Sequence, residues 1–128
     1  MIRPISTAAA AAEFAAEWAA AWNRRDLEAV LAHFHDDVVF TSPTALAVVG
    51  TATVRGKQAL RDYWTIAMGR ITALRFTVDR ALWDSQAREL AIVYVADIEG
   101  KSRRVSENLV FDEAGLVVAA EVFHGVPL

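Results

Sequence analysis

Residues 17–43, EWAAAWNRRDLEAVLAHFHDDVVFTSP, contain the signals for two helices and a strand in close succession. The first part continues an alanine-rich run that predicts a helix from Ser6 or Thr7 to Asn23, because alanine has the highest helix propensity. Asp26 can cap a second, short helix, since its side-chain oxygen accepts hydrogen bonds from free backbone N–H groups. The β-formers that follow predict a strand over Val38–Thr41, which ends before Pro43.

Each of the two predicted helices has one apolar face. Phe14, Trp18 and Trp22 recur every four residues, which places three aromatic rings along one side of the first helix. The apolar positions of the second helix are spaced for burial in the same way, and a polar run predicts its end. The expected buried residues are Leu27, Val30, Leu31 and Phe34, and the closing run is His35-Asp36-Asp37.

The rest of the chain changes from helical to strand periodicity. Residues 44–56 are expected to be irregular, with a small strand near Ala52–Arg55, and a third helix should run from Gly56-Lys57 to Met68-Gly69. Tyr63 and Trp64 lie on its apolar face. Four strands separated by turns are then predicted over Leu74–Trp83, Glu89–Ile98, Ser102–Phe111 and Leu116–His124. Three helices followed by an antiparallel meander indicate an α+β fold in one domain, residues 1–128 with a core of about 6–125.

The composition restricts the class of protein. The 128 residues are 55% hydrophobic and 23% charged, which excludes a disordered chain and favours an apolar cavity or a subunit interface. There is no cysteine, so disulfides and thiolate metal sites are excluded. The net charge of −3 argues against nucleic acid or an anionic membrane as the main partner.

The sequence also predicts a cytoplasmic protein. Glu13 and Glu17 interrupt the apolar run near the N-terminus, which a signal peptide would require to be continuous. The longest uncharged stretch, Val38–Val54, contains Pro43 and Gly50, so we expect no membrane-spanning helix.

Three blocks resemble the nuclear transport factor 2-like superfamily, and within it the SnoaL-like domains and their ketosteroid isomerase relatives. They are the stretch quoted above, VRGKQALRDYW at 54–64, and ENLVFDEAGLVVAAEVFHG at 107–125. The resemblance implies a cone-shaped fold, with three N-terminal helices packed on a curved antiparallel β-sheet. It implies no single activity, because this fold hosts isomerases, cyclases, hydrolases and binding modules.

The isomerase relatives use a tyrosine, a general-base aspartate and a protonated aspartate. The resemblance places these positions on Trp18, Ser42 and Glu107, and only Glu107 keeps an ionisable acid. Ser42 cannot act as a carboxylate base, so we expect no appreciable steroid double-bond isomerase activity.

Strand alternation groups the candidate site residues, because side chains on one face of a strand recur every second residue. If Ala120 and Val122 face a cavity, His124 does too, and Glu107 faces it from the neighbouring strand. We therefore expect Glu107 and His124 to be the catalytic candidates. The expected ligand-binding residues are Trp18, Trp22, Ser42, Trp64, Tyr94, Leu109, Phe111 and Val122.

Glu107 has several possible roles. Burial in an apolar cavity would raise its pKa and make it a general acid or base. It could instead pair with an arginine or with His124, or point at the cavity mouth. Tyr94, Trp18 and Trp64 could equally be ordinary residues of the hydrophobic core that do not contact a ligand. His33 and His35, two positions apart on a predicted helix, would face different directions, so we expect no metal and no cofactor.

Two hypotheses remain open. The first is an enzyme that acts on a small apolar, cyclic or polyketide-like molecule by cofactor-free acid–base chemistry of the isomerase, cyclase or hydrolase type. The second is a non-catalytic ligand-binding or dimerisation module. In either case we expect a homodimer through the outer face of the sheet, where Val117, Ala119 and Phe123 should point.

Overall fold

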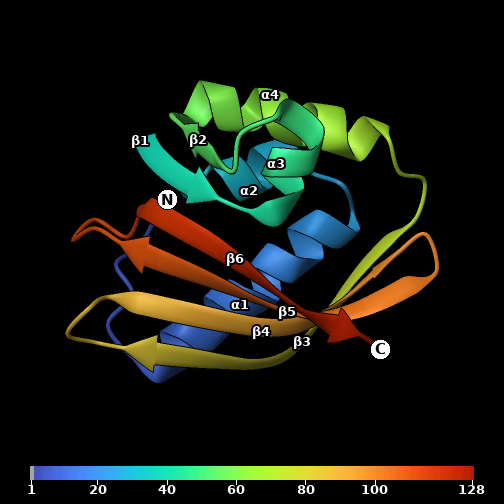
Figure 1. The fold of residues 1–128 in the computed structure, drawn as a ribbon. Coiled ribbons are helices and arrows are strands. Elements are labelled where there is room, and N and C mark those ends of the chain that lie inside the picture. The colour runs from blue at the N-terminus through green and yellow to red at the C-terminus, as the bar shows by residue number, and fades with distance from the viewer. Residues whose placement is uncertain (1) are drawn as a thin grey trace.

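Helix α1 (Ala8–Asn23) begins where the sequence supplies a cap. In the computed structural model, which describes residues 2–128, the Thr7 hydroxyl accepts a hydrogen bond from the backbone N–H of Ala10 at 3.0 Å. The predicted aromatic face is confirmed, since Phe14, Trp18 and Trp22 are all buried. Helix α1 crosses the sheet and contacts the edge strand β3 (Leu74–Asp84) (Figure 1).

The second helix is shorter than predicted. Asp26 caps α2 (Leu27–Leu31) by accepting from the Ala29 N–H at 3.1 Å, but the helix ends before Phe34. Phe34 is the first residue of β1 (Phe34–Thr41), so its assignment to the second helix was wrong. The physical reason is long-range: Phe34 pairs with Val117 of β6 (Val117–Pro127), and this pairing draws the chain into the sheet.

A helix that the sequence analysis missed lies in the segment expected to be irregular. Helix α3 (Pro43–Val49) starts after Ser42, whose hydroxyl accepts from the Thr44 N–H at 3.2 Å. It ends at Gly50, which adopts φ 79°, a left-handed conformation suited to glycine. The described residues therefore form four helices rather than three.

The remaining elements follow the prediction closely. A small strand, β2 (Thr53–Arg55), precedes helix α4 (Lys57–Gly69), and β3 is followed by β4 (Glu89–Ile98), β5 (Lys101–Phe111) and β6. The six strands form one curved sheet in the order β2-β1-β6-β5-β4-β3. The α+β class is confirmed, but β1 runs parallel to β6, whereas the other neighbours are antiparallel.

One irregularity in β6 changes which side chains face the core. Val110 pairs with Ala119 and Phe111 pairs with Val117, so an extra residue lies between them on β6. Val117 consequently faces inward and is fully buried. The prediction that it points outward was wrong. Phe123 is 49% exposed on the outer face, as expected.

None of the helices in the described part of the chain has both the length and the apolar character needed to cross a membrane.

Candidate functional site

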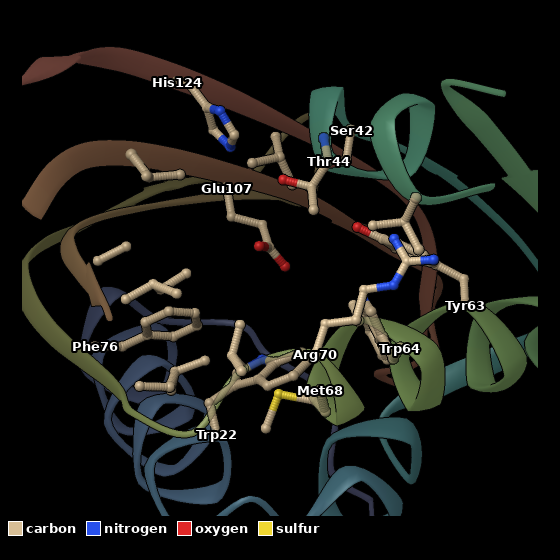
Figure 2. A pocket seen from close by; sticks show the side chains of 18 of the residues that line it. Trp22, Ser42, Thr44, Tyr63, Trp64, Met68, Arg70, Phe76, Glu107 and His124 are labelled. Atoms are coloured by element: carbon tan, nitrogen blue, oxygen red, sulfur yellow. Dashed lines mark hydrogen bonds between the residues drawn. The ribbon is translucent and has the colours of Figure 1, made fainter. Parts of the chain in front are cut away.

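A cavity of about 270 Å³ lies between the inner face of the sheet and the helices (Figure 2). It extends from the surface, where Thr44 and Arg70 are exposed, to the buried side chains of Tyr94 and Glu107, so it is not sealed from solvent. Six aromatic side chains form much of its wall: Trp22, Phe40, Tyr63, Trp64, Phe76 and Tyr94. An apolar wall with few polar groups is typical of small-molecule sites.

The carboxyl group of Glu107 points into this cavity from β5 (Figure 2). Glu107 is only 5% exposed, and its strand neighbours Ile92 and Val122 are apolar and buried. The Tyr94 hydroxyl donates to Glu107 Oε1 over a long 3.5 Å, and Glu107 Oε2 has no hydrogen-bond partner within residues 2–128.

Burial determines the charge of this carboxyl group. Desolvation raises the pKa of Glu107 to about 8, against a smaller opposing effect of the Tyr94 hydrogen bond. No ion pair in the described part of the chain involves Glu107. At neutral pH it is therefore a carboxylic acid that can donate a proton, rather than a carboxylate held by a cation.

Both tyrosines of the cavity also remain protonated. Burial, together with Glu107, raises the pKa of Tyr94 well above its ordinary value. Burial raises the pKa of Tyr63 to about 12, partly opposed by the nearby Ser42 hydroxyl. Both phenols are thus neutral hydrogen-bond donors at physiological pH.

Ser42 has a structural role at the cavity wall. Its hydroxyl caps α3, and the side chain is almost fully buried. A serine hydroxyl cannot supply the carboxylate that the isomerase relatives place at this position.

His124 lines the cavity at its rim without contacting Glu107. Its Nδ1 lies 3.2 Å from the Arg103 guanidinium, and because arginine can only donate, Nδ1 is the acceptor. Partial burial, and then the positive charge of Arg103, lower the pKa of His124. His124 is therefore neutral at pH 7, and the pairing with Glu107 that we considered is not formed.

The structure brings together some of the expected ligand-binding residues and leaves others outside. Those that line the cavity are Trp22, Ser42, Trp64, Tyr94 and Val122.

Three expected ligand-binding residues, Trp18, Leu109 and Phe111, are buried in the core and do not line this cavity. Trp18 supports the wall from behind: its ring stacks on Phe76 with centroids 5.6 Å apart and packs edge-on against Tyr94 at 5.0 Å.

Sequence reasoning did not assign Tyr63, Phe76 and Arg70 to the site. Tyr63 was detectable, because it precedes Trp64 on the same apolar helix face. Phe76 was detectable too, because it alternates with Leu74 and Val78 on one face of β3, whereas Arg70 follows the end of α4 in the α4–β3 loop, where no periodic pattern predicts which side chain enters a cavity.

Two polar side chains far away in sequence hold that loop and the start of β3. The Asn23 amide donates to Phe76 O at 2.9 Å and accepts from Phe76 N at 2.7 Å. The Arg25 guanidinium donates to the carbonyls of Met68 and Ile71 at 2.7 and 3.0 Å. The backbone on both sides of Arg70 is therefore anchored.

Comparison with known proteins agrees with this fold. The family model of the SnoaL-like domain matches residues 15–119. The chain therefore belongs to the SnoaL-like domain family, and its fold is that of nuclear transport factor 2-like proteins. None of the curated proteins is similar enough to this chain to match it.

Solved structures show the same architecture. A SnoaL-like protein of unknown function from Burkholderia thailandensis is 31% identical, with a TM-score of 0.85 over 97% of this chain and 100% of that one. TerC, co-crystallised with polyporic acid, is 14% identical, with a TM-score of 0.73 over 89% and 90%. A computationally designed 17-OHP binder is 21% identical, with a TM-score of 0.68 over 91% of each chain.

Proposed function

We propose that the chain binds a small, mostly apolar cyclic molecule in this cavity and that Glu107 donates a hydrogen bond, or a proton, to an oxygen of that molecule. The observation that carries the proposal is the buried Oε2 atom of Glu107, which faces an apolar cavity without a hydrogen-bond partner. A buried polar atom without a partner costs free energy, and a ligand that supplies the partner recovers it.

A second unpartnered group supports the same proposal. The indole Nε1 of Trp22 is buried, belongs to a lining residue and has no acceptor within residues 2–128. Glu107 approaches the cavity from the sheet and Trp22 approaches it from α1, so a ligand between them could accept one hydrogen bond from each. The structures of TerC with polyporic acid and of the designed 17-OHP binder support the compatibility of this fold with ligand binding.

The chemistry available to Glu107 is acid–base catalysis without a cofactor. In its neutral form it can protonate a carbonyl oxygen, and the resulting carboxylate can take a proton back in a later step. Reactions of the isomerase, cyclase or hydrolase type on a carbonyl-containing ring fit these groups.

The role of Ser42 favours a second candidate function. Since position 42 caps a helix and carries no carboxylate, the site lacks the separate base of the isomerase relatives. A binding module that holds the same ligand without turnover uses the same cavity and the same Glu107.

A bicyclic ketone, 1-tetralone, tests the proposal by calorimetry at pH 6.5. We expect Glu107→Leu, which removes the donor, to weaken binding about tenfold, as expected for loss of one buried hydrogen bond. Glu107→Gln keeps a donor but cannot transfer a proton, so it should bind 1-tetralone nearly as well as the wild type while abolishing turnover of any substrate.

The matched control is Glu113→Gln, because the Glu113 side chain is 86% exposed at a turn. Equal affinity of the wild type and Glu107→Leu for 1-tetralone would contradict the proposed role of Glu107. Once a substrate is known, its turnover by the Glu107→Gln variant at the wild-type rate would contradict the acid–base role of Glu107.

We also propose that the protein is a homodimer through the outer face of the sheet. Phe123 and Leu82 are large apolar side chains, 49% and 55% exposed on that face, and a second subunit packed there would bury them. Sedimentation at micromolar concentration should show a dimer, and Phe123→Glu should shift it to a monomer. A wild-type monomer under these conditions would refute the assignment.

A further inference from the structure

At neutral pH the charged side chains around the cavity are cationic. Among residues 2–128, Glu107 is the one acidic residue that lines the cavity, and Arg70 is the one lysine or arginine. Arg70 is exposed, extends from the end of α4 over the cavity (Figure 2), and makes no ion pair within residues 2–128.

A wider hollow of about 580 Å³ adjoins the cavity on the side of β5 and β6. The two spaces share lining residues, among them Thr44, Val105 and His124, so they lie directly side by side. The hollow is lined by Lys101 and Arg103, and by no aspartate or glutamate of the part of the chain that the structure describes.

These cations are available to a ligand. Neither Lys101 nor Arg103 forms an ion pair in the described part of the chain. Within residues 2–128, the one side chain that shares a hydrogen bond with the Arg103 side chain is the His124 ring, which is neutral, so no anion compensates the guanidinium charge there. Arginine guanidinium groups bind carboxylates through paired, charge-assisted hydrogen bonds.

The interior end of the same cavity is uncharged at neutral pH. The groups there are the carboxylic acid of Glu107, the phenols of Tyr63 and Tyr94, and aromatic rings. The site therefore combines an apolar, hydrogen-bonding interior with a cationic rim.

We infer that the ligand is an amphipathic organic anion, whose ring system occupies the interior beside Glu107 and whose acidic group lies at the rim among Arg70, Lys101 and Arg103. This inference rests on the proposed function, because it specifies the class of molecule that the Glu107 cavity takes. The interior volume of about 270 Å³ is at the small end for ligand sites and suits one or two fused rings.

The test compares 2-naphthoate with 2-naphthamide, two molecules of nearly equal shape that differ in charge, by calorimetry at pH 6.5. We expect the wild type to bind the carboxylate about tenfold more tightly than the amide, as charge-assisted hydrogen bonds allow. In the double variant Arg70→Gln/Arg103→Gln the preference should fall below about twofold, because the carboxylate loses more affinity than the amide.

The control is Arg55→Gln, which removes the same charge from an exposed position that lines neither space. Circular dichroism would show that each variant is folded, and the single variants would show which arginine contributes more. Added salt should reduce the preference for the carboxylate in the wild type, because an exposed rim is screened.

The outcomes separate this inference from the proposed function. If both molecules bind with equal affinity, or if the double variant keeps the preference, the anion assignment is overturned and the cavity function stands. If neither molecule binds to the wild type, the proposed function fails and this inference fails with it.

Discussion

Glu107→Gln is expected to stabilise the protein at pH 8 and to have a much smaller effect at pH 5. The pKa of Glu107 is raised in the folded state to about 8, from an ordinary value of 4.5. The folded state therefore holds a proton that the unfolded state has lost between these two values. The stabilising contribution of Glu107 is fully present below pH 4.5 and is lost progressively as the pH rises to about 8.

The size of the effect follows from the same separation of pKa values. At about 1.4 kcal/mol per pH unit, the loss has an upper limit of about 5 kcal/mol. Glutamine does not titrate, so its own burial cost is the same at every pH. We subtract the unfolding free energy of the wild type from that of the variant. This difference should be about 2–4 kcal/mol more positive at pH 8 than at pH 5.

Urea unfolding of both proteins at the two pH values measures this difference, with Glu113→Gln as the exposed control. A clear loss of stability at both pH values would show that Glu107 acts as a structural partner of another group. That result would remove the argument for a site built around a neutral carboxyl group.

Asn23→Ala is expected to destabilise the protein by about 2–3 kcal/mol, because the change removes two hydrogen bonds and leaves the backbone of Phe76 without them. β3 is an edge strand, so no further strand can replace these bonds. Phe76 forms part of the cavity wall, and the change should also weaken ligand binding.

Thermal or urea unfolding measures the loss. Asn108→Ala on β5 is the control, since the hydrogen bonds of the Asn108 side chain within residues 2–128 are to the side chains of Ser106 and Glu89. Asn23→Asp should also destabilise the protein. The carboxylate can still accept a hydrogen bond from Phe76 N, but it has no N–H to donate to the Phe76 carbonyl oxygen, which then repels it. Equal stability of Asn23→Ala and the wild type would show that α1 and β3 are held by apolar packing alone.

Local chemistry explains why much of the fold was predictable. Alanine content, the caps at Thr7 and Asp26 and the aromatic spacing act within a few residues, so α1 and the start of α2 follow from them. Ser42-Pro43 and Gly50 are signals of the same kind for α3, although the sequence analysis expects an irregular segment there.

Phe34 and Val117 show where local signals fail. Phe34 has helical spacing relative to Leu31 and Val30, yet it pairs with Val117, a residue more than eighty positions away. The bulge that turns Val117 inward depends on the pairing of β5 with β6, and strand alternation within β6 predicts the opposite face.

For the site, sequence alone identified a carboxyl group, Glu107, among apolar neighbours on a strand, because alternation is a local property. Only the tertiary structure determined its surroundings: the unpartnered Oε2, the separation of His124 from Glu107, and the position of Arg70 at the rim. The physical reason is that the pKa of a buried group depends on desolvation and on charges brought close by elements distant in sequence. These distances are fixed by packing of α1 and α4 on the sheet, which no short stretch of the chain encodes.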